Sequence, residues 1–129
     1  MFYTLPVPIS CDLDDAPRSI RFNVTGEWPS IAELGAIRQQ LISTRLLTDQ
    51  TKGLFDLRMV ASVPKYSEVE EIVRAAMKQG GLPLRRAYLV GASVHYGLVR
   101  QMQAVAPPQI SIEIFTDEKS AVRWLSSSD

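Results

Sequence analysis

The sequence lacks most of the features that identify a chemical function. Cys11 is the only cysteine among 129 residues, so an internal disulfide and cysteine-based zinc sites are excluded. His95 is the only histidine, and no other ligands are spaced around it for a metal. Neither a Gly-x-Gly-x-x-Gly nor a Walker sequence is present, which disfavours the common nucleotide-dependent enzymes. We therefore expect no metal and no cofactor.

An excess of charge and long apolar runs are missing too. The 14 basic and 14 acidic residues cancel, which predicts no nucleic-acid binding, because that affinity comes mostly from neutralised phosphates. No apolar segment approaches the ~20 residues that span a bilayer, so we expect no membrane insertion. The N-terminus lacks a basic region followed by a long apolar run, so no signal peptide is expected. These features predict a cytoplasmic protein of one domain, residues 1–129.

Four segments have the patterns of β-strands. Ser19–Thr25 alternates apolar and polar residues, which is typical of a strand with one wet or partly covered face. Gly53–Leu57 and Arg86–Gly91 show no alternation and are apolar apart from Asp56 and Arg86, as expected of central strands covered by helices on both sides. Gln109–Phe115 alternates again and predicts an edge or one-faced strand.

Helices are predicted after each of these strands. Ser30 and Glu33 form a capping box before a helix that runs to about Thr44. A second capping box, Ser67–Glu70, opens a helix that ends at Gly80 and the glycine after it.

The last two helices have weaker boundary signals. One follows a turn at Ala92, with Ser93 as its expected N-cap, and stops at Pro107. Thr116 or Asp117 caps the final helix.

The N-terminal segment is harder to interpret. Phe2–Leu5 suits a short strand, which Pro6 and Pro8 confine to an edge or a loop. Ser10–Pro17 carries three aspartates but lacks the glycine and distal glutamate of a calcium loop, so we expect a solvated loop. The order is β-α-β-α-β-α-β-α with room for an extra N-terminal strand. This order predicts an α/β domain with a mixed, mainly parallel sheet and right-handed crossovers.

Asp56 is the most unusual residue, because a carboxylate inside an apolar strand is costly unless it is paired. It is either a general base or metal ligand, or the partner of Arg58 or another arginine, and the second interpretation is favoured. His95 is either an acid–base group or an exposed or cap-associated side chain, and again the second is favoured. The stretch from Gly91 to His95 lacks the second glycine of a nucleophile elbow. No catalytic residue is assigned, and we expect the protein not to be an enzyme.

Three stretches carry a family resemblance: Gly53–Arg58, Tyr96–Arg100, and Ile114–Glu118 with the nearby Ala121 and Trp124-Leu125. On these, the chain resembles the SpoIIAA-like proteins, which are relatives of the STAS domains of anti-sigma-factor antagonists, sulfate transporters and lipid-trafficking accessory proteins. The resemblance implies a mixed sheet with helices packed on it and no catalytic apparatus. The fold is also compared with the lipid-carrying CRAL-TRIO domains, which implies that an apolar ligand is compatible with it.

The resemblance also bears on a phosphorylation switch. In the antagonists, a serine that follows an aspartate at the start of the helix after the central strand is phosphorylated by a partner kinase. The matching stretch here, Arg58–Pro64, has no Asp-Ser pair. Ser62 and Ser67 are the nearest serines to that position.

The sequence and the resemblance favour two functions. The first is a non-enzymatic STAS-like module that binds a protein partner or pairs with itself through a partly uncovered sheet face. The alternative is a carrier of a small apolar or acidic ligand, or a lipid, in a crevice between Arg58–Tyr66 and Ser93–Tyr96. The candidate ligand or partner residues are Asp56, Arg58, Ser62, Ser93, His95, Tyr96 and Arg100.

Overall fold

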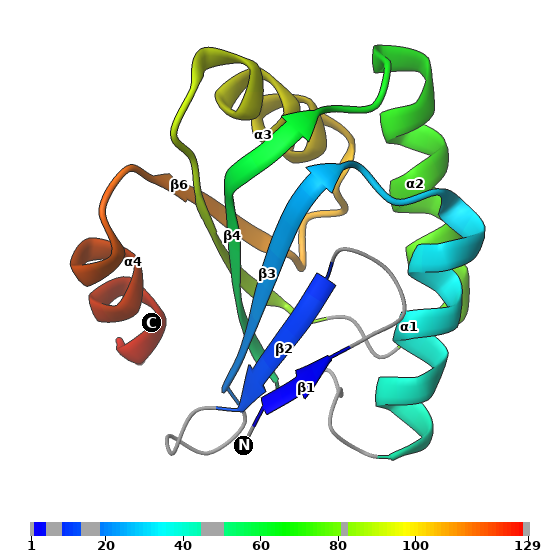
Figure 1. Ribbon diagram of the computed structural model, residues 1–129, viewed down its shortest axis with the longest axis horizontal. Helices are drawn as coiled ribbons and strands as arrows, with labels where there is room; N and C mark the ends of the chain where they lie inside the picture. The colour runs from blue at the N-terminus through cyan, green and yellow to red at the C-terminus, as the bar shows by residue number, and fades with distance from the viewer. Residues whose placement is uncertain (1, 5–8, 14–18, 45–50, 81–82, 128–129) are drawn as a thin grey trace.

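The strands form a single mixed sheet (Figure 1). The computed structural model describes residues 2–4, 9–13, 19–44, 51–80 and 83–127, with side chains from residue 20 onward. Within these residues the strands are β1 (Phe2–Thr4), β2 (Ile9–Leu13), β3 (Ser19–Glu27), β4 (Lys52–Ser62), β5 (Arg85–Leu89) and β6 (Ser111–Phe115). The helices are α1 (Ile31–Ser43), α2 (Tyr66–Gln79), α3 (Ser93–Val105) and α4 (Glu118–Ser126). The strands lie in sequence order across the sheet, antiparallel from β1 to β3 and parallel from β3 to β6.

The helices cover the two faces unequally. Because the parallel strands follow one another in order and crossovers are right-handed, the three connecting helices α1, α2 and α3 fall on one face. Helix α4 lies alone on the other (Figure 1). The central strands β4 and β5 are therefore covered on both sides, as their continuous apolar patterns predicted.

Two hydrophobic cores result. The larger one joins the sheet to α1, α2 and α3, and its buried members are Ile20, Phe22, Val24, Ile37, Leu41, Leu57, Val60, Val69, Ala76, Tyr88, Val90, Leu98, Val99, Met102, Ile110 and Ile112. The smaller one joins the sheet to α4 through Leu54, Ala87, Leu89, Ala121 and Leu125.

Helix α4 is fastened to the sheet by cations at its C-terminus, where unpaired helix carbonyls accept hydrogen bonds. Lys52 Nζ donates to the Leu125 carbonyl at 2.7 Å. The Arg85 guanidinium donates to the Trp124 carbonyl at 2.6 Å and lies 3.8 Å from the centre of the Trp124 ring.

The N-terminal loop prediction was wrong in part. Ile9–Leu13 forms strand β2, so the first residues of the expected loop Ser10–Pro17 are extended. The backbone register sets the alternating apolar residues of β2 opposite those of β3, which explains the pairing. Residues 14–17 lie outside the described part of the chain.

Strand β4 is longer than predicted and carries a bulge. It continues past Leu57 to Ser62, so the first part of the Arg58–Tyr66 segment, expected to line a crevice, is strand. Its register with β3 shifts between Asn23 and Thr25, where three steps along β4 match two along β3. As a result Arg58 and Met59 are both exposed before the chain returns to the core at Val60.

Two caps agree with the sequence. The Ser30 hydroxyl accepts from the Glu33 amide at 3.1 Å, and the Glu33 carboxylate accepts from the Ser30 amide at 2.9 Å, which confirms the capping box. The Asp117 carboxylate accepts from the Ser120 amide at 2.9 Å, which settles the choice between Thr116 and Asp117.

Two other caps were predicted wrongly. Helix α2 begins at Tyr66, and the Glu68 carboxylate accepts from the Lys65 amide at 2.9 Å, so Ser67 lies inside the first turn. Ser93 is the first residue of α3 and is not its N-cap. Both errors come from serines that lie one or two residues inside the helix.

Candidate functional site

Asp56 is the centre of an ion-pair network, on the face of the sheet that α4 covers. Its side chain is 12% exposed. Arg21 Nη2 lies 2.8 Å from Asp56 Oδ2, and Arg58 Nη2 lies 2.7 Å from the same oxygen. Glu118, in the first turn of α4, accepts from Arg21 at 2.7 Å. Pairing with arginines was the favoured interpretation of Asp56, and it is confirmed.

The β4 bulge explains why Arg58 makes several hydrogen bonds to Asp56, two residues before it. The Arg58 amide, displaced from the regular ladder, donates to Asp56 Oδ1 at 3.1 Å, and Arg58 Nε donates to the same oxygen at 2.9 Å. Burial alone would raise the pKa of Asp56, but the hydrogen bonds from Arg58 and the charges of Arg58 and Arg21 hold it below its ordinary value. A carboxylate held as an anion by two arginines is a structural anchor and a weak base.

His95 is buried, at 3% exposed, and lies in the first turn of α3. Of the expected exposed or cap-associated side chain, the exposed alternative was therefore wrong. Its Nδ1 accepts from the Gly91 amide at 3.3 Å, and its Nε2 lies 2.9 Å from the Val60 carbonyl. With Nδ1 as acceptor, Nε2 is the donor to the Val60 carbonyl. It joins the start of α3 to β4, on the face of the sheet opposite to Asp56, and the two side chains do not converge.

The other predicted residues lie on the surface near the carboxyl ends of the strands. Ser62, Ser67, Ser93, Tyr96 and Arg100 are all exposed. Arg100 donates to Gln103, one turn along α3, at 3.2 Å. Around them are large exposed apolar side chains: Met59, Tyr66, Val94 and Tyr96.

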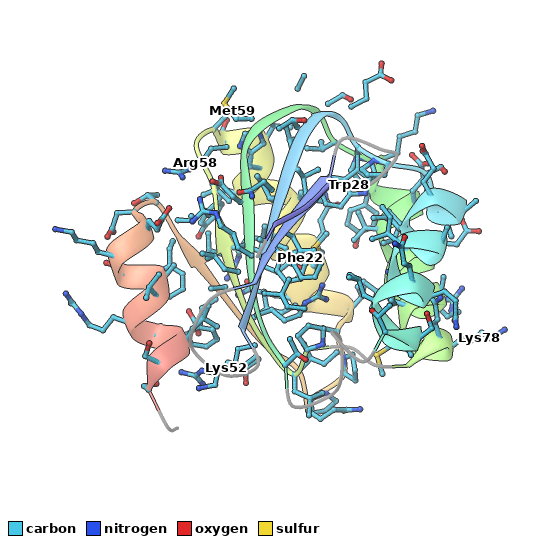
Figure 2. The ribbon with its side chains drawn as sticks, turned by 60° about the horizontal axis from the view of Figure 1, so that its bottom comes forward. Phe22, Trp28, Lys52, Arg58, Met59 and Lys78 are labelled. Atoms are coloured by element: carbon cyan, nitrogen blue, oxygen red, sulfur yellow. The ribbon has the colours of Figure 1, made fainter. Side chains whose placement is uncertain are left out.

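A cavity that the sequence did not predict lies on the opposite side of the sheet from Asp56, beneath α1 and α2. It encloses about 110 Å³. Its floor is a row of stacked rings across three strands, with Phe55 4.7 Å from Phe22 on one side and 4.7 Å from Tyr88 on the other. Figure 2 shows Phe22 and Trp28 on the α1 side of the sheet and Arg58 on the α4 side. The apolar lining from the two helices is Leu34, Ile37, Leu41, Ile72, Val73 and Ala76.

Two arginines line this apolar space. Arg86, on β5, places its guanidinium carbon 4.4 Å from the centre of the Phe55 ring and 5.6 Å from that of Tyr88. Arg38, on α1, donates to Gln79 Oε1 at 2.7 Å. Burial and the nearby charge of Arg86 lower the pKa of Arg38 to about 10. Burial raises the pKa of the Tyr88 hydroxyl, and the charges of Arg86 and Arg38 oppose that rise.

A groove of about 310 Å³ between α1 and α2 adjoins the cavity. The two share Leu34, Arg38 and Ile72 as lining, so these side chains separate the interior from the surface. Gln79 bridges the helices there, since its Nε2 donates to the Gly35 carbonyl at 2.8 Å while its Oε1 accepts from Arg38. The groove and the cavity are therefore neighbours across these shared side chains.

The cavity left one signal in the sequence. Arg38 occupies a core-facing position of α1, four residues after Leu34 and three before Leu41. Arg86 likewise lies in a segment that is otherwise apolar. A charged residue at such a position is costly, and it could have marked the site as Asp56 did.

In the described part of the chain, no group of three or more histidine, cysteine or acidic side chains could hold a metal ion. None of its helices is long and apolar enough to cross a membrane.

No family model and no curated protein matches this chain. Among solved structures, it is similar to an uncharacterized protein of the DUF3478 family from Shewanella loihica, which has a SpoIIAA-like fold. The two chains share 17% identity, and the match covers 91% of each with a TM-score of 0.64. At this identity the likeness shows the fold alone. This chain has four parallel strands that alternate with four helices, and together with the likeness this shows an α/β, SpoIIAA-like fold.

Proposed function

We propose that this domain is a non-catalytic carrier of a small molecule with an apolar body, bound in the cavity between α1, α2 and the sheet. The observation that carries the proposal is the enclosed space of about 110 Å³ above the Phe22–Phe55–Tyr88 rings. It is smaller than the apolar cavity of about 150 Å³ that holds benzene in an engineered protein, so a bound ring or short chain would also need space beyond it. The adjoining groove would provide that space.

This proposal moves the ligand away from the crevice expected at the strand ends. The candidates Asp56 and Arg58 there already neutralise each other, which leaves little for a ligand to bind. The cavity beneath α1 and α2 instead combines apolar walls with a few polar groups, the usual composition of a ligand site.

Native mass spectrometry of the gently purified protein tests the carrier. We expect an adduct of discrete mass that is lost in Ala76→Leu, because Ala76 lines the cavity and the larger side chain fills it. The matched control is Ala104→Leu, since Ala104 is exposed on α3 and should keep the adduct. An adduct that survives Ala76→Leu, or protein that is free of ligand and unresponsive to every apolar ligand in thermal melting, would contradict the proposal.

Binding of a protein partner, or self-pairing, is a second candidate function. The expected surface was the partly uncovered sheet face at Ser19–Thr25 and Gln109–Phe115, but Arg21 in the first of these strands is engaged by Asp56 and Glu118. The exposed apolar side chains at the strand ends support association better, with Met59 71% and Tyr66 72% exposed.

Light scattering after size exclusion tests the self-pairing version. We expect a dimer at high concentration that Met59→Lys abolishes. Val122→Lys should leave it intact, because Val122 is 41% exposed but lies on α4. A wild-type protein that remains monomeric at high concentration would rule out self-pairing.

A further inference from the structure

We infer that the ligand of the cavity is a carboxylate with an apolar body, whose anionic group pairs with Arg86 and Arg38 while the body lies against the stacked rings. This inference rests on the proposed carrier function and names the chemical class of its ligand. It would make the protein a carrier of short organic acids.

The first argument is an unpartnered donor. Arg86 Nε is buried, and no hydrogen-bond acceptor reaches it from the residues that the structure describes. The guanidinium carbon instead lies 4.4 Å from the centre of the Phe55 ring and 5.6 Å from that of the Tyr88 ring on the cavity floor. Ring faces offset part of the cost of burying a cation, but they do not accept its N–H groups as an oxyanion does. The Arg86 side chain is therefore incomplete without an acceptor inside the cavity.

The second argument is the charge balance. Arg38 and Arg86 come from opposite walls, a helix and a strand, and are close enough for the charge of one to act on the other. The described lining of the cavity contains no aspartate or glutamate. Two like charges in an apolar setting repel each other and lose hydration, and an anion between them would relieve both penalties.

A third donor points the same way. Trp28 also lines the cavity, and its Nε1 is buried without a hydrogen-bond partner among the described residues. Buried indole N–H groups normally find an acceptor. The cavity thus offers donors from β5, α1 and the segment before α1, which is a set suited to a ligand that only accepts.

A carboxylate fits these donors better than a phosphate. An arginine fork binds the two carboxylate oxygens side by side, and one negative charge costs less to dehydrate than the near-double charge of a phosphate monoester. The small enclosed volume and the apolar walls favour the smaller, less hydrated group.

The experiment compares ligands that share one apolar body. Isothermal titration of the wild-type protein at neutral pH would use octanoate, octan-1-ol and octyl phosphate, with hexanoate and hexan-1-ol as a shorter pair. We expect the acids to bind at least about tenfold more tightly than the alcohols, the factor expected of a charge-assisted hydrogen bond in a dry site.

Arg86→Leu should remove this preference while leaving alcohol binding in place, because it deletes the charge and keeps an apolar wall. Arg38→Gln is a second variant that retains a donor near Gln79, and it should weaken acid binding more than alcohol binding. Arg74→Leu is the matched control, since Arg74 is an exposed residue of α2 paired with Glu70, and it should bind like the wild type.

The outcomes separate this inference from the carrier proposal. Equal affinity for acids and alcohols would overturn the carboxylate assignment and leave the carrier standing. Tighter binding of octyl phosphate than of octanoate would also overturn it, in favour of a phosphate ligand. Absence of binding by every compound to the wild-type protein would overturn both.

Discussion

Arg85 and Arg86 are neighbours on β5, and their side chains leave opposite faces of the sheet. Arg85 donates to the Trp124 carbonyl at 2.6 Å and fastens α4, whereas Arg86 lies over the Phe55 ring in the cavity. Arg85 thus has acceptors in α4, whereas no acceptor among the described residues reaches the buried Nε of Arg86.

The free energy of unfolding should therefore respond differently at the two positions. Arg85→Leu should lower it by about 1.5–3 kcal/mol, because hydrogen bonds from a charged group are lost. Arg86→Leu should change the stability of ligand-free protein by less than about 1 kcal/mol, or raise it, because a buried unpaired charge is removed. Urea unfolding measures both, and a large loss for Arg86→Leu would show that the protein itself already satisfies that side chain.

Gln79 should control access to the cavity. Gln79→Ala removes the hydrogen bonds to the Gly35 carbonyl and to Arg38 that bridge α1 and α2. We expect a loss of about 1–2 kcal/mol in stability and faster hydrogen exchange of α1 amides. Gln40→Ala, on the exposed face of α1, is the matched control. Unchanged exchange of α1 in Gln79→Ala would show that other contacts hold the helix pair closed.

Asp56 should make stability depend on pH in the acid range. Its pKa is lower in the folded protein than its ordinary value of 3.8, so the folded state binds fewer protons than the unfolded chain. The contribution is complete above that value and is lost as the pH falls through the folded pKa. Asp56→Asn should cost about 1.5–3 kcal/mol near neutral pH, and the difference from wild type should shrink below about pH 4. Urea unfolding across this range measures it, and a difference independent of pH would contradict the ionic role.

His95 and Tyr96 are adjacent but should differ sharply when truncated. His95→Ala leaves the Val60 carbonyl and the Gly91 amide without their partner, and we expect a loss of about 2–4 kcal/mol. Tyr96 is 48% exposed, and Tyr96→Ala should cost less than about 1 kcal/mol. Thermal unfolding compares the two, and equal losses would argue against a buried, hydrogen-bonded His95.

Substitution by alanine should have opposite effects on stability at two glycines, one beneath the Phe55 ring and one on α1. A Cβ at Gly53 would lie 2.6 Å from the Phe55 ring, so Gly53→Ala must displace a ring that is stacked on both sides, at a cost of about 1–3 kcal/mol. A Cβ at Gly35 meets only Gln79 Oε1 at 3.9 Å, so Gly35→Ala in α1 should stabilise by about 0.4–1 kcal/mol. Calorimetry checks both signs, and a neutral Gly53→Ala would mean that the ring row can shift freely.

The fold could be predicted from periodicity, because the strands of a sheet and the helices that cover it leave regular apolar patterns. Strand β2 was missed because the aspartates and prolines around it are typical of loops. The bulge in β4 was missed because a register shift depends on the partner strand, which one segment does not reveal.

Residues of the candidate site could be predicted only where the sequence places a charged side chain in an apolar segment, because burial of a charge is costly. Asp56 stood out in an apolar strand, and its arginine partner on β4 was close in sequence. Arg38 and Arg86 are 48 positions apart by their numbering, and their proximity depends on how α1 packs on β5. The cavity results from the packing of helices on the sheet, and no spacing of residues in the sequence predicts it.

The consecutive strand order has a consequence for how the chain acquires its shape. Each strand from β2 to β6 adds beside the one just made, so no segment must wait for a distant partner or pass between elements already in place. Such local pairing favours rapid folding. The layer that encloses the cavity is complete once β6 is paired, before α4 docks on the reverse side. We expect the amides around the cavity to become protected from hydrogen exchange before those of α4. Pulse-labelling hydrogen exchange during refolding would measure this order.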